Sequence, residues 1–424
     1  MNKPVCAITL PLLLFSLVSA DAGDWTRFRG PNGSGVGTAA NLPVEFSEAD
    51  LKFKTPLPGG SGCGSPVVWG KKVFVLSADP EDATRYMVCI HADSGDVLWH
   101  KEFKSEPHHL HTRSSYASCT PAVDEERVYV AWSTPQQTLF KAFLHDGTEA
   151  WSIDLGTWQS QHGWGTSPVV YQDLVILHNS QQANQLKEGE EPGRSFMMAF
   201  NRKTGEEQWR TELVSKNVCY SVPFIHISAD GRDELICSST GNGIFSLDPL
   251  TGSENWSLND GLFSMRTVGS PIEAAGHIFG STGSGGYSGN YIVAVKPGPA
   301  PELAYKIANS SKFKAPYVPC LIADGELVFC LYDRGFASCI DAQSGEIHWT
   351  ARTGAAFSGS PVRVDDRIYC VDEDGVVWVI AASPTEYKLL AKNDLGEECR
   401  STPAVANGRL YVRTNGHLFG IGGQ

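Results

Sequence analysis

The chain has 424 residues and a net charge of −13 at pH 7, with 19% charged residues, 43 glycines and 24 prolines. Abundant glycine and proline favour many short strands joined by turns over long helices. No run of lysine or arginine stands out, so nucleic acid and anionic membranes are disfavoured as partners, because both are bound by basic surfaces.

The first twenty residues have the pattern of an export signal. Lys3 supplies positive charge, Val5 to Val18 is almost wholly apolar, and small residues permit cleavage after Ala20. The alternative is a membrane anchor, but this stretch is short for a span of about 20 residues. We therefore expect residues 1–20 to be a cleaved signal peptide. The mature protein is then periplasmic or secreted, without stable membrane insertion.

Residues 21–50 are predicted to form an N-terminal arm. Its segment from Trp25 to Gly35 reads W-T-R-F-R-G-P-N-G-S-G. The glycines and the proline favour an extended, turn-rich backbone. We expect the arm to pack Trp25 and Phe28 on the rest of the fold, and a ligand site is the alternative.

A small residue, a proline and two or three apolar residues recur along the rest of the chain. Within a unit, segments in which apolar and polar residues alternate, such as Arg367 to Val371, are followed by glycine turns such as Asp374-Gly375. This pattern indicates half-buried strands. Units of this length with strand content predict the four-stranded blades of a β-propeller. Eight prolines, 42 to 55 residues apart, mark the units: Pro66, Pro121, Pro168, Pro223, Pro271, Pro319, Pro361 and Pro403.

An aromatic residue follows a Thr/Ser-Gly turn at the end of most units, as in Ser344-Gly345 and Trp349. The glycine takes positive φ in the turn. We expect the aromatic ring, which buries ~150–250 Å², to pack between neighbouring blades. The residues at this position are Trp99, Trp151, Trp209, Trp256, Tyr305 and Trp349.

The last unit stops after Ile421 and lacks its outer strand, and Leu51 to Leu57 has the pattern of that strand. Phe53 lies 13 residues before Pro66 and takes the place of the aromatic ring. Residues 51–424 are therefore predicted to be an all-β propeller of eight four-stranded antiparallel blades. The N-terminal strand completes the last blade, which removes an exposed sheet edge.

The cysteines divide into two groups. Half of the ten that follow the signal segment replace small or apolar residues of the repeat, and we expect these in the core. Cys63 and Cys399 lie in the first and last blades, so a disulfide between them that closes the ring is considered, if their Cα atoms come within ~7 Å. No CxxC pair is present, so we expect no zinc site.

The loops that enter the inner strands are rich in aromatic and charged side chains. Such a rim suits a peptide, a sugar or a cofactor, and a solvated rim without a ligand is the alternative. Its histidines suit a metal ion, although we expect a flexible loop there and predict no metal ligands. No catalytic constellation is found. The candidate rim residues are His108, His111, Arg113, Tyr116, Trp158, His162, Trp164, Tyr220, Arg266, Lys314, Tyr317, Glu398 and Arg400.

At the repeat prolines and the Trp signature, residues 51 to 424 resemble the PQQ-like (pyrroloquinoline quinone) β-propeller repeat family. The segment from Trp25 to Gly35 resembles the opening of secreted members of planctomycete type. The resemblance implies one of two functions. The family's periplasmic outer-membrane assembly propellers are eight-bladed lipoprotein scaffolds, whereas its longer dehydrogenases hold PQQ on calcium and carry an Asp base and an adjacent Cys-Cys pair.

No two cysteines of this chain are adjacent, which counts against the dehydrogenase function. We therefore expect a non-catalytic monomeric scaffold, without a cofactor, that binds a protein or a small ligand at the channel mouth. The alternative is a PQQ- and calcium-dependent quinoprotein oxidoreductase. No cysteine follows the apolar segment closely, so the lipid anchor of the assembly propellers is not expected, and a role at the outer membrane is left open.

Overall fold

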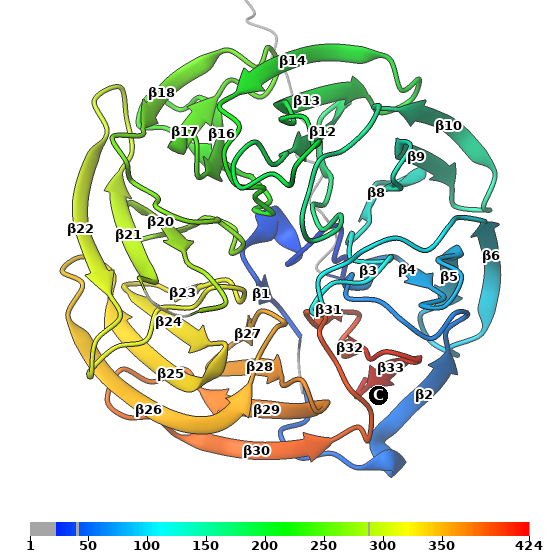
Figure 1. Ribbon diagram of the computed structural model, residues 1–424. Coiled ribbons are helices and arrows are strands. Elements are labelled where there is room, and N and C mark those ends of the chain that lie inside the picture. The colour runs from blue at the N-terminus through cyan, green and yellow to red at the C-terminus, as the bar shows by residue number, and fades with distance from the viewer. Residues whose placement is uncertain (1–22, 40–41, 287–288, 424) are drawn as a thin grey trace, which may run out of the picture.

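Eight sheets lie radially around a central channel in the computed structural model, which describes residues 23–39, 42–286 and 289–423 (Figure 1). The predicted eight-bladed all-β propeller is thereby confirmed. Seven sheets have four strands and one has five. The predicted signal peptide lies outside the described residues. Within the described ranges, no helix is long and apolar enough to span a bilayer.

The strands follow one another from the channel outward in each blade, and the first seven blades are consecutive along the chain. Blade I is β3 (Val67–Trp69), β4 (Lys72–Ala78), β5 (Arg85–His91) and β6 (Val97–Phe103). Blade II is β7 (Ala122–Val123), β8 (Arg127–Ser133), β9 (Thr138–Leu144) and β10 (Glu149–Asp154). Blade III is β11 (Val169–Tyr171), β12 (Leu174–Asn179), β13 (Ser195–Asn201) and β14 (Glu207–Leu213). Blade IV is β15 (Phe224–Ile227), β16 (Asp233–Ser239), β17 (Gly243–Leu247) and β18 (Glu254–Leu258).

The second half of the ring repeats this order. Blade V is β19 (Ile272–Ala274), β20 (His277–Thr282), β21 (Tyr291–Lys296) and β22 (Glu302–Ala308). Blade VI is β23 (Ile322–Asp324), β24 (Leu327–Tyr332), β25 (Arg334–Asp341) and β26 (Ile347–Ala356). Blade VII is β27 (Val362–Val364), β28 (Arg367–Val371), β29 (Val376–Ala381) and β30 (Leu389–Asp394), and β1 (Val36–Gly37) is its fifth strand. Blade VIII is β31 (Ala404–Ala406), β32 (Arg409–Arg413), β33 (His417–Ile421) and β2 (Leu51–Pro56). Two short 3₁₀ helices, η1 (Pro31–Gly33) and η2 (Glu48–Asp50), lie before the first blade.

The two ends of the propeller meet in blade VIII. Strand β2 pairs antiparallel with β33, and Phe53 lies opposite Gly420. The Thr55 hydroxyl donates a 2.6 Å hydrogen bond to the carbonyl oxygen of Gly95 in blade I. The N-terminal strand therefore completes the last blade as predicted, and no outer edge of β33 is left unpaired.

The aromatic rings of the repeat lie against the turn glycine of the next blade. A Cβ atom at Gly95 would lie 2.4 Å from the Phe53 ring, so only glycine permits this approach. The same close approach, below 3 Å, joins Gly147 to Trp99, Gly205 to Trp151, Gly252 to Trp209, and Gly345 to Tyr305. Most of these rings also donate to a backbone carbonyl of that blade, such as Trp99 Nε1 to His145 at 3.0 Å.

Trp256 and Trp349 depart from this arrangement. Trp256 Nε1 donates to the buried carboxylate of Glu234 in its own blade, at 2.7 Å. Trp349 Nε1 donates to the carbonyl oxygen of Ser383 in blade VII, at 2.8 Å, and its ring packs on Tyr387. Both indoles therefore keep a hydrogen-bond acceptor, although Trp349 is only half-buried and neither ring has the glycine contact.

A belt of hydrogen bonds joins the inner strands around the channel. Seven backbone N–H groups donate to a hydroxyl or thiol at the equivalent position of the next blade, and each such bond contributes about 0.5–1.5 kcal/mol. Val222 interrupts the belt because it has no side-chain acceptor. The donor and acceptor pairs are Thr402 to Ser65, Ser65 to Thr120, Thr120 to Ser167, Val222 to Ser270, Ser270 to Cys320, Cys320 to Ser360, and Ser360 to Thr402.

The belt explains why a small residue precedes most repeat prolines, and it corrects one of them. In blade VI the belt residue is Cys320, and β23 begins at Ile322. The repeat position of this blade is therefore Leu321 instead of Pro319. The proline of this unit lies two residues before the repeat position, whereas the small belt residue Cys320 keeps its place and its two belt hydrogen bonds.

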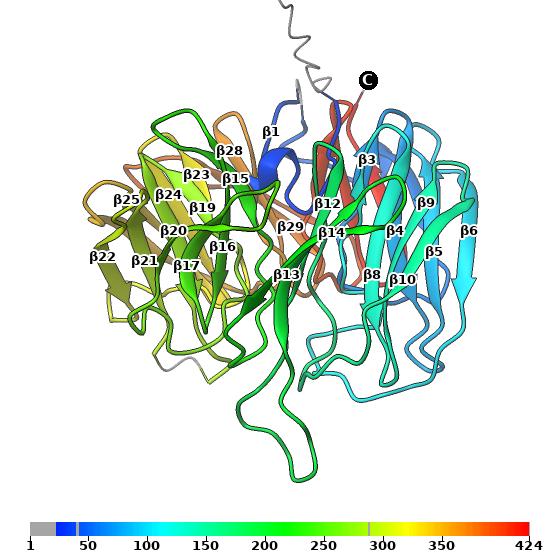
Figure 2. The same ribbon diagram turned by 90° about the horizontal axis from the view of Figure 1, so that it is seen from above.

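The N-terminal arm crosses one end of the central channel. Trp25 pairs with Val68 of blade I through two 2.9 Å backbone hydrogen bonds, and β1 pairs in parallel with β27 of blade VII. Figure 2 shows the arm at one end of the ring, near the C-terminus, with the long loops at the opposite end. The arm therefore lies within the ring of inner strands and covers that end of the channel.

Two arginines of the arm bind carbonyl groups across the channel. Arg27 Nη2 donates to Pro223 of blade IV at 2.5 Å, and Arg29 Nη2 donates to Leu321 of blade VI at 2.6 Å. Burial lowers the pKa of Arg27 to about 9, with the nearby Arg29 as a second cause. The two guanidinium groups thus fix the arm to two separate blades of the ring.

Candidate functional site

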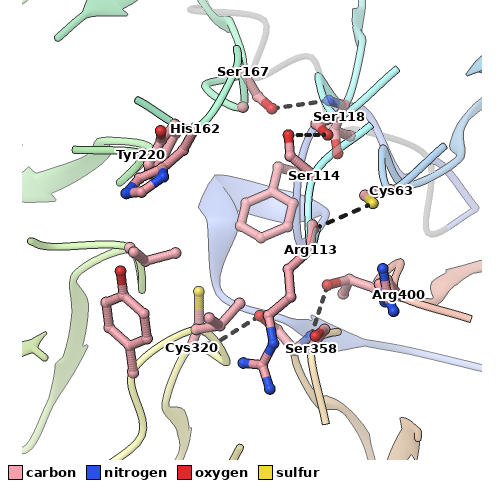
Figure 3. A pocket seen from close by; sticks show the side chains of 18 of the residues that line it. Cys63, Arg113, Ser114, Ser118, His162, Ser167, Tyr220, Cys320, Ser358 and Arg400 are labelled. Atoms are coloured by element: carbon pink, nitrogen blue, oxygen red, sulfur yellow. Dashed lines mark hydrogen bonds between the residues drawn. The ribbon is translucent and has the colours of Figure 1, made fainter. Parts of the chain in front are cut away.

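A cavity of about 540 Å³ occupies the central channel on the side of the long loops. Its wall includes residues from all eight blades, and Phe28 of the arm contributes to it from the covered end. Figure 3 shows Arg113, His162, Tyr220 and Arg400 around this cavity. Its volume is in the range of small-molecule sites, about 300–1,000 Å³. The arm and the belt together therefore form a cavity that opens toward the loops.

Seven of the thirteen predicted rim residues line this cavity. Because each inner strand is entered from the same end of the ring, loops that are far apart in sequence converge there. The seven residues are His111, Arg113, His162, Tyr220, Arg266, Tyr317 and Arg400.

Arg113 belongs to the loop between blades I and II and reaches the far side of the ring. Its guanidinium lies 3.7 Å from the Asp333 carboxylate of blade VI and 3.8 Å from Glu373 of blade VII. Burial raises the pKa of Asp333, which accepts N–H bonds from Tyr317 and Val318. The loop thus spans the mouth and is held by charge on the opposite wall.

Arg266 is the most enclosed cation of the wall, with 6% of its surface exposed. Its Nη2 donates to Gln161 Oε1 at 3.1 Å. Its backbone carbonyl accepts bonds from the Thr282 hydroxyl and from the Gly283 N–H. The main chain that carries this guanidinium is therefore fixed at the wall.

Two histidines share the positive environment of the wall. Burial lowers the pKa of His162 to about 4, with Arg266 as the second cause. Burial and then Arg113 lower the pKa of His111. The two rings contact edge to face with centroids 4.9 Å apart. Both imidazoles are therefore neutral at pH 7 and offer one donor and one acceptor each.

The other six predicted rim residues do not line the cavity. Tyr116 and His108 bind each other, since the Tyr116 hydroxyl donates to the His108 carbonyl at 2.8 Å. Trp158 Nε1 donates to Ser180, and its ring packs on the buried Trp164. Glu398 is exposed. The sixth residue, Lys314, is half-buried outside the wall.

Sequence reasoning missed several wall residues. Phe28 was expected to pack on the fold, and it forms part of the cavity surface. Arg334 begins β25 and was not considered. The belt residues Ser65, Thr120, Ser167, Cys320, Ser360 and Thr402 also line the cavity. The small residue that precedes most repeat prolines could have indicated the belt residues of the wall. These residues bind the next blade from the inner strand, and that position faces the channel.

Cys63 and Cys399, the pair considered for a disulfide, are both free thiols. Cys63 lines the cavity, while Cys399 is fully buried and contacts the Arg413 carbonyl at 3.2 Å. Burial raises the pKa of the Cys399 thiol to about 11. The thiols therefore lie near the joint between the first and last blades, where the repeat alignment placed them.

The donor set of the wall does not fit a calcium-bound quinone. Calcium takes oxygen ligands, mainly carboxylates, whereas no Asp or Glu is among the described residues that line the cavity. Asp333 lies behind the wall and already accepts two backbone N–H bonds. Across the described ranges, no cluster of three or more His, Cys, Asp or Glu side chains is arranged to hold a metal ion.

One family model matches the chain, over residues 33–218 and 313–386, and its description is outer membrane protein assembly factor BamB. These ranges cover more than half of the sequence. No curated protein matches the chain significantly.

Solved structures show the same architecture. BamB from Moraxella catarrhalis is 15% identical, with a TM-score of 0.61, over 88% of this chain and 97% of that one. A europium-containing methanol dehydrogenase is 11% identical, with a TM-score of 0.67, over 93% and 89%. Quinohemoprotein alcohol dehydrogenase from Comamonas testosteroni is 13% identical, with a TM-score of 0.63, over 95% and 81%. At these identities the likeness shows the fold alone.

Proposed function

Since the chain belongs to the PQQ-like propeller family described as outer membrane protein assembly factor BamB, we propose that it is a non-catalytic binding scaffold. The observation that carries this proposal is the cavity of about 540 Å³, which is covered by the arm and opens toward the loops. Its wall offers hydrogen-bond donors, aromatic rings and cations, and among the described residues no wall serine or cysteine side chain is hydrogen-bonded to a wall histidine. Such a site binds a ligand or an inserted chain segment without transforming it.

The mouth also has a projecting segment that suits a protein partner. Residues 180–194, between β12 and β13, extend beyond the ring on the loop side (Figure 2). Gln161 Nε2 binds the Gln185 carbonyl, which ties this segment to the loop that carries His162. A partner that inserts into the cavity would therefore also contact this segment, which enlarges the interface beyond the channel.

We place this scaffold in the periplasm or outside the cell, as a monomer. The support is the apolar N-terminal segment followed by small residues. A quinoprotein oxidoreductase is not favoured, because the wall lacks carboxylate ligands for calcium among its described residues.

The mouth residues, rather than the outer blades, are expected to carry partner binding. The double variant Arg266→Ala with His162→Ala should capture at least tenfold less partner from an extract of the native host, because both side chains line the cavity. Capture is measured by quantitative affinity pull-down with the purified mature protein. The melting temperature is recorded alongside, to show that the variant is folded.

The matched control removes one basic residue and one histidine from the outside of the ring. Lys203→Ala with His348→Ala changes two exposed side chains away from the cavity. It should capture the partner as the unmodified protein does. Equal capture by all three proteins would contradict a binding site at the channel mouth.

A further inference from the structure

The cavity wall has the opposite charge sign to the protein as a whole. The chain carries a net charge of −13. The described wall nevertheless contains four arginines, Arg113, Arg266, Arg334 and Arg400, and no carboxylate. A positive cavity in a negative protein concentrates anions locally, because low-dielectric walls focus the field of the cations they hold.

Arg266 is buried without a compensating negative charge. It is 6% exposed. Among the described residues its guanidinium donates only to the neutral side-chain amide of Gln161, and its Nε atom has no hydrogen-bond partner. A buried guanidinium normally pairs with a carboxylate or another anion, because desolvation of an unpaired charge is costly. The buried Arg27 and Arg29 donate to backbone carbonyls and do not line the cavity. Arg266 does line it, so a bound ligand can reach its guanidinium and supply the missing negative charge.

Arg400 repeats this arrangement from blade VIII. Its Nη1 donates to the Thr112 carbonyl at 2.8 Å, and its Nε atom also lacks a partner within the described ranges. No ion pair joins Arg266 or Arg400 to a described carboxylate. The nearby Asp333 and Glu373 lie within 4 Å of Arg113, so they compensate a different cation.

The neutral groups of the wall suit an organic anion. Tyr220, Tyr317 and Phe28 supply aromatic surface, while His111 and His162 supply hydrogen-bond donors that carry no charge at neutral pH. Arginine binds planar carboxylates through two parallel N–H bonds, which gives geometric specificity as well as attraction. A carboxylate joined to an apolar body would use both kinds of surface.

We infer that the channel mouth binds a carboxylate-bearing ligand, and that Arg266 and Arg400 are the residues that recognise the carboxylate. This inference rests on the proposed function and names the chemistry of its ligand. The carboxylate has two sources, a free small organic acid or an acidic side chain of an inserted peptide segment. Both present the same group to the same arginines.

Isothermal titration calorimetry of the purified mature protein tests the inference with two ligands. The first is citrate, and the second is a short aspartate-containing peptide blocked at both ends, with its asparagine counterpart as the neutral reference. Citrate binding indicates the free acid as the source, and preferential binding of the aspartate peptide indicates an inserted segment. Either result should weaken as salt is raised, because an anion is bound.

The variants locate the binding. Arg266→Gln should weaken the affinity at least tenfold. Arg400→Gln, at the more exposed of the two arginines, should do the same and serves if the first variant fails to fold. Lys312→Gln removes an equal charge from an exposed position outside the wall and should change the affinity less than twofold.

Failure of the inference is distinguishable from failure of the proposed function. If neither citrate nor the aspartate peptide binds, or if Arg266→Gln and Arg400→Gln bind as tightly as the unmodified protein, the anion inference is overturned. Loss of partner capture by the Arg266 and His162 double variant would still support the scaffold. If that variant also captures the partner normally, both conclusions fall.

Discussion

Phe53→Ala should lower the free energy of unfolding by about 3–5 kcal/mol, the usual cost of removing a buried aromatic ring. Phe53 is 9% exposed and lies on Gly95 of blade I, against Gly420 of its own blade and near Tyr411. Its removal leaves a cavity at the joint between the first and last blades. For a chain of this size, the melting temperature should fall by roughly 5 °C or more.

The neighbouring exposed residue provides the control for this prediction. Lys52→Ala, on the same strand but facing solvent, should change the melting temperature by about 1 °C or less, since surface substitutions change stability by about 0.5 kcal/mol. Equal effects of the two variants would show that β2 does not close the ring through its aromatic side chain. Thermal unfolding followed by circular dichroism suffices for both variants.

Trp25→Ala should release the arm from the channel while the blades stay folded. Trp25 has no exposed surface, pairs with Val68, and lies against Gly30 and Gly37. Loss of its indole removes about 3–5 kcal/mol of packing, so that only the backbone pairings and the contacts of Arg27 and Arg29 then hold the segment. Hydrogen exchange of the amides in residues 24–37 should become much faster, and the amides of β4 and β8 should keep their protection.

Glu45→Ala is the matched control, because Glu45 is an exposed residue of the arm that lies beyond residues 24–37. Its exchange pattern should equal that of the unmodified protein. If Trp25→Ala instead speeds exchange throughout the inner strands, the arm is an integral part of the ring and not a separate cover. If it leaves residues 24–37 protected, the indole does not hold the arm in the channel.

The blades could be predicted from sequence because their signals are local and repeated. The alternating strands recur along the chain, and in most units a glycine turn is followed four residues later by an aromatic ring, so that one unit confirms the next. The missing outer strand of the last unit identified Leu51 to Leu57, because a closed ring cannot leave one sheet edge unpaired. The pairing of β2 with β33 confirms that prediction.

The fifth strand and the course of the arm were beyond this reasoning. The segment from Trp25 to Gly35 occurs once, so no repeat defines its register. Both of its arginines bind residues more than 190 positions away, Pro223 and Leu321. Every residue has a backbone carbonyl, so a hydrogen bond to that group does not require a particular side chain. Such bonds therefore cannot be predicted from the type of the accepting residue.

The candidate site was predicted in part for a related reason. The sequence shows which loops enter the inner strands, and seven of their chosen side chains reach the cavity. It does not show the direction of each side chain. Tyr116, which binds within its own loop, and Trp158, which binds Ser180, therefore looked equivalent to Tyr220. The reach of Arg113 to Asp333 depends on loop curvature across the mouth, which no local pattern encodes.

The account depends most on the closure of one end of the channel by the arm. A crystal structure of the mature protein tests this most directly. We predict continuous density from Trp25 to Val36 across the channel, with β1 on β27 and Phe28 facing the cavity. A channel open from end to end, with the arm on the outside of the ring, would contradict the account.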